Sequence, residues 1–175
     1  MVSEDTVQQV RSYVKGQAER HPLPDLVTRV RATYDELSAL VRDMTPEQAA
    51  FRGNPDDWTL QEVMGHVATY TPNVRWVMGE LDAGRNVAYP RRNLGEPPLS
   101  HLSVQEAADT ALTALTEIDE AFRGREPNIE TYTAHPTFGE MNAKEWVLFL
   151  RVHTNDHVDQ VRAAVAHPDY PAGPG

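Results

Sequence analysis

The chain has 175 residues, enough for one domain with a sizeable apolar core, and its composition is that of an ordinary globular protein. Its formal net charge of −10 argues against nucleic acid as a main partner, because binding to phosphates requires a clustered basic face. Cysteine is absent, which excludes disulfides, thiolate metal ligands and a cysteine nucleophile.

Helical patterns dominate the N-terminal part. Ser3 opens a short amphipathic segment, which we treat as an N-terminal helical extension over residues 1–21, and the His-Pro-Leu-Pro stretch ends it. The next helix carries apolar residues at helical spacing over residues 26–41. Residues 45–48 form a capping box with proline at the first helical position, which predicts one short helical turn.

Two further helices occupy the middle of the chain. Residues 59–62 form a second capping box, after which apolar residues recur at helical spacing up to Leu81. Residues 103–106 form a third one and open a helix that ends before Gly124. The stretch 85–102 between these helices has no helical periodicity, and a loop of that length in a compact domain is usually functional or disordered.

The C-terminal part begins with an irregular stretch over residues 126–141, in which we expect a short hairpin around 131–133. Residues 142–145 then cap a last long helix. This helix fades before Pro168, so that residues 168–175 are expected to form a tail.

The pattern as a whole predicts an all-α fold. Four long amphipathic helices with two long connections are typical of a four-helix bundle, and these loops are long enough to cross over it. We expect one domain over residues 1–175, with its core at about 24–167. The chain has neither a signal-peptide pattern nor an apolar run of membrane-spanning length, so we expect a cytoplasmic protein without membrane contacts.

Two histidines one helical turn apart, His153 and His157, are the most informative feature of the last helix. Residues four apart differ by about 40° around a helix axis, and both rings fall within the apolar stripe that faces the core. Burying two titratable rings is costly unless their nitrogens are satisfied, and a divalent metal would satisfy them. His66, at the edge of the apolar face of another helix, would complete a three-imidazole site with an open coordination position.

An alternative without metal stays open, in which the three histidines are core residues satisfied by hydrogen bonds. A lone histidine such as His66 is more often a residue of that kind than a ligand. The chain also lacks the glutamate that zinc proteases place after their first histidine. Glu62, Asp156 and Gln160 are candidates to orient a ring through its second N–H, although such residues are more often solvated. We expect the other four histidines to lie on the surface: His21, His101, His135 and His167.

In order and spacing, these motifs resemble those of the DinB/YfiT-like superfamily of metalloenzymes, in its DinB-like branch. Residues 57–67 are similar to the family's Trp-Ser/Thr segment before the first ligand. Residues 135–139, followed by 145–146, are similar to its loop before the last helix. Residues 153–161 are similar to its final His-x-x-x-His-x-x-Gln signature, and the resemblance covers roughly residues 24–167.

The resemblance implies a four-helix bundle with a pocket at one end and a bound metal. The metal would be nickel or zinc, with iron as a third candidate, and its ligands would be His66, His153 and His157. Characterised members include S-transferases and isomerases that use a low-molecular-weight thiol such as mycothiol, bacillithiol or glutathione. Members of the family are frequently homodimers, so a homodimer is also implied here.

We therefore expect a metal-dependent enzyme of the transferase or hydrolase type, with thiol-dependent S-transfer to a small electrophile as the leading hypothesis. The ion would activate either water or the thiol. Trp58 and Tyr70 would line the pocket, and Arg91 or Arg92 would steer an anionic thiol. Asp156 is a candidate for the general base. Two alternatives stay open: a metal-dependent hydrolase without a thiol, and a non-catalytic, stress-related bundle that binds a metal or another ligand.

Overall fold

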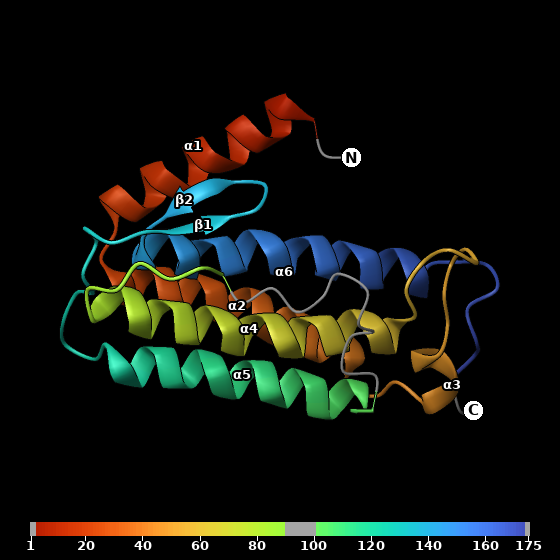
Figure 1. Cartoon of the computed structure of the whole chain (residues 1–175). Helices are drawn as coiled ribbons and strands as arrows, with labels where there is room; N and C mark the ends of the chain where they lie inside the picture. The colour runs from red at the N-terminus through yellow and green to blue at the C-terminus, as the bar shows by residue number, and fades with distance from the viewer. Residues whose placement is uncertain (1–2, 90–100, 174–175) are drawn as a thin grey trace.

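The computed structural model describes residues 3–89 and 101–173. Four long helices form a bundle in this part of the chain, which confirms the predicted fold class (Figure 1). They are α2 (Leu23–Val41), α4 (Leu60–Asp82), α5 (Val104–Ala121) and α6 (Ala143–Val165). Within the described residues, every helix is too short or too polar to cross a lipid bilayer.

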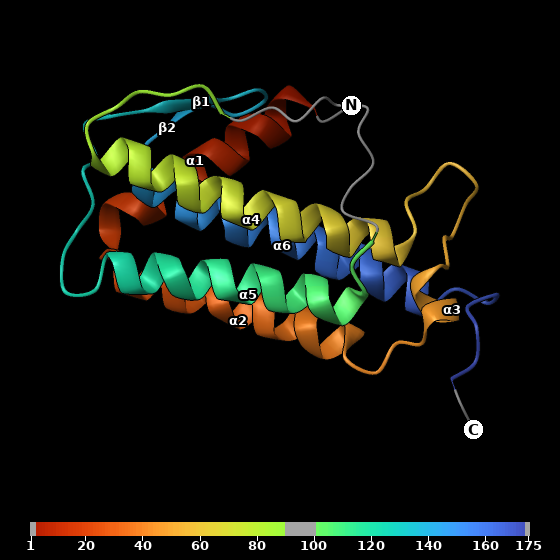
Figure 2. The same ribbon diagram turned by 60° about the horizontal axis from the view of Figure 1, so that its bottom comes forward.

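The order of the four helices around the bundle differs from their order in the chain. Helices α2 and α4 each pack mainly against α5 and α6, so that α2 lies diagonally opposite α4, and α5 opposite α6. Helices α2 and α6 run in one direction and α4 and α5 in the other (Figures 1 and 2). The connection from α2 to α4 and the connection from α5 to α6 therefore each join two helices that lie diagonally opposite each other in the bundle.

Capping boxes fix where the bundle helices begin. Both reciprocal hydrogen bonds of the box are present at the predicted starts of α4, α5 and α6, and also at the short helix α3 (Pro46–Ala49). Each N-cap contributes about 1 kcal/mol to stability. The caps also fix on which side of each helix the histidines lie. His66 lies two turns after Thr59, and His153 lies three turns after Asn142.

The core lies between the four long helices and is apolar. Helix α6 is buried nearly all round in its first half, where five consecutive residues from Trp146 to Leu150 are at most 3% exposed. The residues of this run do not alternate between an apolar and a polar face. The reason is that α6 is covered there by further elements as well as by its neighbours in the bundle.

The elements that cover α6 are the N-terminal helix and a small hairpin. Helix α1 (Glu4–Arg20) has 17 residues, lies within the predicted N-terminal extension over residues 1–21, and packs against α6. The hairpin pairs β1 (Thr133–His135) with β2 (Gly139–Met141), slightly later in the chain than predicted. Gly139 has a φ of 75°, a left-handed conformation that favours glycine and that the tight turn requires.

Candidate metal centre

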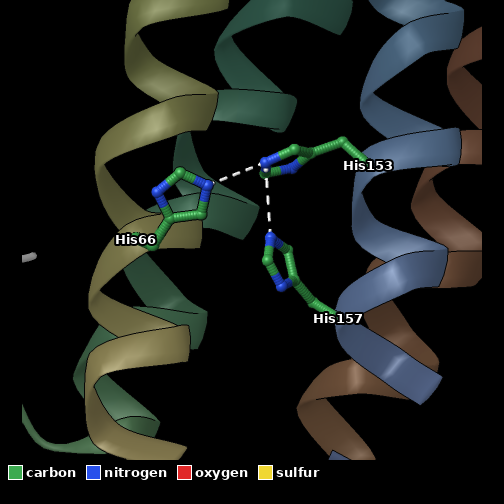
Figure 3. Close-up of side chains that lie close together, drawn as sticks. All are labelled: His66, His153 and His157. Atoms are coloured by element: carbon green, nitrogen blue, oxygen red, sulfur yellow. Dashed lines mark hydrogen bonds between the residues drawn. The ribbon is translucent and has the colours of Figure 1, made fainter. Parts of the chain in front are cut away.

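Three imidazole rings converge between α4 and α6 (Figure 3). His66 Nε2 lies 2.9 Å from His153 Nε2, and His157 Nε2 lies 3.3 Å from the same atom. Two imidazoles bound to one ion at about 2.0–2.1 Å have nitrogens roughly 2.9–3.4 Å apart for angles between 90° and 109°. The separations in the cluster therefore match those of ligands that share one ion, and the triad can hold a metal.

The positions of the protons on the rings also fit an ion. His157 Nδ1 lies 2.9 Å from Gln160 Oε1, and because an amide oxygen only accepts, Nδ1 donates and Nε2 carries a lone pair. His153 Nε2 takes part in both short contacts, one with His66 and one with His157. This atom carries either a proton or a lone pair, so it can form a hydrogen bond with only one of the two neighbouring rings. The other contact therefore lacks a hydrogen bond. His153 Nδ1 is fully buried without a hydrogen-bond partner among the described residues, and with an ion at Nε2 it would carry the proton of the ring. An ion placed among three lone pairs would satisfy all three Nε2 atoms.

Burial keeps the three rings neutral at neutral pH. Burial, followed by the proximity of His157, lowers the pKa of His66 to about 4. Burial, followed by the neighbouring histidines, lowers the pKa of His153 well below its usual value. The pKa of His157 is also lowered by burial, against the opposing effect of its hydrogen bond to Gln160. Neutral imidazole is the form that binds metal ions, so the triad does not have to lose protons first.

Aromatic side chains surround the triad. Tyr70 stacks on His153, with ring centroids 3.9 Å apart and planes inclined by 14°. Trp58 lies against His66 at 5.2 Å, although its own side chain remains 47% exposed. Both residues predicted to line a pocket are therefore next to the triad, one buried and one at the surface.

The three polar residues predicted to orient the rings have different positions. Gln160 does so through its hydrogen bond to His157. Glu62 closes the capping box instead, because its carboxylate accepts hydrogen bonds from the backbone N–H and the hydroxyl of Thr59. Asp156 is exposed. Among the described residues, no carboxylate hydrogen-bonds to any of the three rings.

The expectation that four histidines lie on the surface holds only for His101. His21 and His167 are half-buried, and His167 packs against Phe51. His135 is half-buried because the hairpin folds back onto α6, and its ring lies 4.9 Å from that of Phe149. The proline that follows His135 in the sequence gives no indication of this packing.

Sequence reasoning also missed Tyr89, which lies seven residues after the end of α4. Its ring stacks on Trp146 at 5.1 Å and lies 5.8 Å from Tyr70. Residues 83–89 turn back along α4 (Figure 2), and no periodic pattern signals such a return. Arg91 and Arg92, which were expected to steer an anionic thiol, lie outside the described residues.

A cavity of about 310 Å³ lies near the triad, although none of the three histidines lines it. Trp58 and Gln160, which contact His66 and His157 respectively, both line it. The rest of its lining combines apolar side chains from the start of α4 and the end of α6 with polar ones such as Asp57 and His167. The cavity is therefore connected to the triad only through Trp58 and Gln160.

Comparisons with known proteins support the fold and show the family of the chain. The crystal structure of TT2238, described as a four-helix bundle protein, is similar with a TM-score of 0.61 over 81% of this chain and 98% of that chain. Sequence identity is 23%, so this likeness shows the fold alone. No curated protein matches the sequence. The family model for the DinB superfamily matches residues 29–161, a span that includes all three histidines, and the chain therefore belongs to the DinB superfamily.

Proposed function

We propose that this protein is a divalent-metal-dependent enzyme that transfers a low-molecular-weight thiol to a small electrophile. The observation that supports the proposal most is the convergence of three neutral imidazoles with their Nε2 atoms 2.9 and 3.3 Å apart. His66, His153 and His157 would hold the ion, with nickel or zinc as the expected metal. When bound, the ion supplies Lewis acidity, which favours the deprotonated form of a nucleophile.

The residues around the triad favour a thiol over water as that nucleophile. A thiol has a pKa near 8.5 without a metal, against about 15.7 for water, so a thiol bound to the ion depends less than water on help from a neighbouring base. The described residues place no carboxylate in hydrogen-bond contact with the triad, and Asp156 is exposed. The chain has no cysteine, so the thiol must come from outside the protein.

The protein's own residues would then bind and orient the reactants. Tyr70, buried and stacked on His153, keeps that ring in place and presents an apolar wall. Trp58 shields one side of His66 from water. Gln160 keeps the proton of His157 on Nδ1, which leaves Nε2 free to bind. An electrophile with an apolar body fits such surroundings better than a highly charged one.

A transfer assay tests the proposal. The protein is purified without a histidine tag, loaded separately with nickel or zinc, and incubated with a chlorinated nitroaromatic and a panel of small thiols. Thiolate attack on the ring carbon expels chloride, and both the thioether and the chloride are measured. We expect wild type to be active and His153→Ala to be inactive. His101→Ala, which changes an exposed histidine outside the triad, is the matched control and should retain wild-type activity.

Two results would reject the proposal. Metal content below a tenth of an equivalent per chain after loading would remove the metal site. Equal rates for wild type and His153→Ala would show that any transfer is independent of the triad. Hydrolysis of activated esters by metal-loaded wild type, without any dependence on thiol, would instead favour the hydrolase alternative.

A further inference from the structure

The cavity of about 310 Å³ near the triad lies at the end of the bundle where α4 begins and α6 ends (Figure 1). Small-molecule sites in proteins have volumes from about 300 Å³ upwards, so the cavity has room for a compact ligand. Most of its lining is apolar, with Trp58, Leu60 and Val63 near the start of α4 and two alanines in the last turns of α6. Two polar side chains from distant parts of the chain, Asp57 and His167, also line it. The cavity therefore combines room for a small molecule with polar groups that can orient it.

The carboxylate of Asp57 is held by the fold through one of its two oxygens. Asn54 donates to Oδ2 from its backbone N–H at 3.1 Å and from its side-chain amide at 2.7 Å. Oδ1 has no hydrogen-bond partner among the described residues. The turn before α4 thus fixes the carboxylate and leaves one oxygen as a free acceptor.

The ring of His167 is fixed in a similar way. Its Nδ1 accepts from the backbone N–H of Asp169 at 3.2 Å, so Nδ1 carries a lone pair and the proton of the neutral ring is on Nε2. Phe51 packs against the ring, with centroids 5.4 Å apart, and limits its rotation. Within the part of the chain that the structure describes, Nε2–H has no hydrogen-bond partner, so the ring offers a free donor.

The donor and the carboxylate flank the same small space, which exists because residue 53 is glycine. A Cβ atom at position 53 would lie 3.6 Å from Oδ2 of Asp57 and 3.9 Å from Cδ2 of His167, the ring carbon bonded to Nε2. Gly53 itself lines the cavity. One corner of the cavity is thus bordered by a carboxylate and by an N–H donor. Together they match a chemical group that carries an acceptor and a donor side by side.

The same pair of groups sets the charge of a suitable ligand. An anionic ligand would place its charge near the carboxylate of Asp57, in a chain whose net charge is −10. A ligand with donors alone would leave the N–H of His167 unpaired. A neutral carboxamide pairs with both groups, because its carbonyl oxygen accepts and its N–H donates. Trp58 remains 47% exposed and offers an aromatic face to the rest of the ligand.

We propose that this cavity binds a small neutral molecule with a carboxamide group on an aromatic body. The carbonyl oxygen accepts from Nε2–H of His167, the amide N–H donates to the carboxylate of Asp57, and the aromatic ring lies against Trp58. None of the three histidines of the triad lines the cavity, so the site is independent of a bound metal and goes beyond the proposed function.

Three probes of nearly the same shape test the class of ligand. Benzamide carries an acceptor and a donor, benzoate carries two acceptors and a negative charge, and benzamidine carries two donors and a positive charge. Each is titrated into the full chain in the presence of a chelator, and the indole N–H of Trp58 is followed by NMR. A fragment of this size should bind with a dissociation constant on the order of 1 mM. We expect benzamide to bind about three- to tenfold more tightly than the other two, because each of those lacks one of the two hydrogen bonds.

Two glycine variants test the position of the site. In Gly53→Ala the added methyl group enters the space between Asp57 and His167 without a clash, and Gly53 does not have the left-handed conformation that would strain an alanine. Gly79→Ala is the matched control, because its methyl group meets nothing within 4 Å and Gly79 does not line the cavity. Gly53→Ala should bind benzamide about tenfold more weakly than wild type, because the methyl group separates the carboxamide from its two partners. Gly79→Ala should bind it as wild type does.

Three results would overturn this proposal. One is the absence of a shift in the Trp58 signal at about ten times the expected dissociation constant. The others are binding of benzoate or benzamidine as tight as that of benzamide, and equal affinities of Gly53→Ala and Gly79→Ala for benzamide. All three are measured without metal or thiol, so failure of this inference can be told from failure of the proposed function.

Discussion

Replacing His153 by leucine should leave the stability of the metal-free protein nearly unchanged, although part of the residue is buried. The Nδ1 atom of His153 is fully buried without a partner, and a buried unsatisfied polar group costs about 1–3 kcal/mol. Leucine is close to histidine in size and belongs in the apolar stripe of α6, so it removes this cost without leaving a cavity. The variant loses the stacking on Tyr70, which is worth about 0.5–1.5 kcal/mol. It also loses the hydrogen bond that His153 Nε2 can make to one neighbouring ring, which is worth about another 0.5–1.5 kcal/mol. We therefore expect the gain and the losses to cancel to within about 1 kcal/mol.

Urea unfolding at pH 7.5 with a chelator measures this difference. His157→Leu is the control, because its Nδ1 is satisfied by Gln160 and little should be gained by removing it. Adding metal at a hundred times its Kd should stabilise wild type by about 2.7 kcal/mol and leave His153→Leu unchanged. If the metal-free variant were less stable than wild type by about 2 kcal/mol or more, the ring of His153 would be in a satisfied environment and our account of the cluster would be refuted.

Three further predictions concern the surroundings of the triad. Because the pKa of His66 falls from 6.5 to about 4 on folding, the metal-free protein should be most stable above pH 6.5 and lose stability as the pH falls towards 4. At pH 5 this ring alone should cost about 2 kcal/mol, and urea unfolding of His66→Asn should show a shallower pH dependence; an equal slope would contradict the shift. Gln160→Ala should weaken metal binding about 10- to 100-fold in chelator competition, and an unchanged affinity would show that the hydrogen bond to His157 has no such role. Asn142→Ala should lower the free energy of unfolding by about 1 kcal/mol through the lost cap of α6 without changing metal stoichiometry, and no loss of stability would contradict the capping argument.

Features that depend only on residues close together in the sequence could be predicted well. The capping boxes are local, because a side chain and the backbone N–H three residues later satisfy each other whatever surrounds them. They placed the beginnings of α4, α5 and α6 correctly. The i, i+4 spacing of His153 and His157 likewise places both on one face of any helix. His66 on the facing flank of another helix was therefore a testable partner, and the structure brings the three rings together.

Features that depend on which elements meet in space could not be predicted from the sequence. The patterns of α2, α4, α5 and α6 are equally compatible with several orders around a bundle, and only packing selects the diagonal arrangement. His135 was expected at the surface because its neighbours in sequence are polar or proline, whereas the hairpin carries it onto aromatic side chains of α6. Glu62 was a candidate to orient His66, but the capping box at Thr59 takes up its carboxylate.

We propose that His66, His153 and His157 bind one divalent ion through their Nε2 atoms. Diffraction data collected at the absorption edge of nickel or zinc, from crystals of the metal-loaded protein, test it most directly. We predict one anomalous peak at about 2.0–2.3 Å from all three Nε2 atoms. A peak at other residues, or no peak between α4 and α6 after loading with each metal, would contradict the claim.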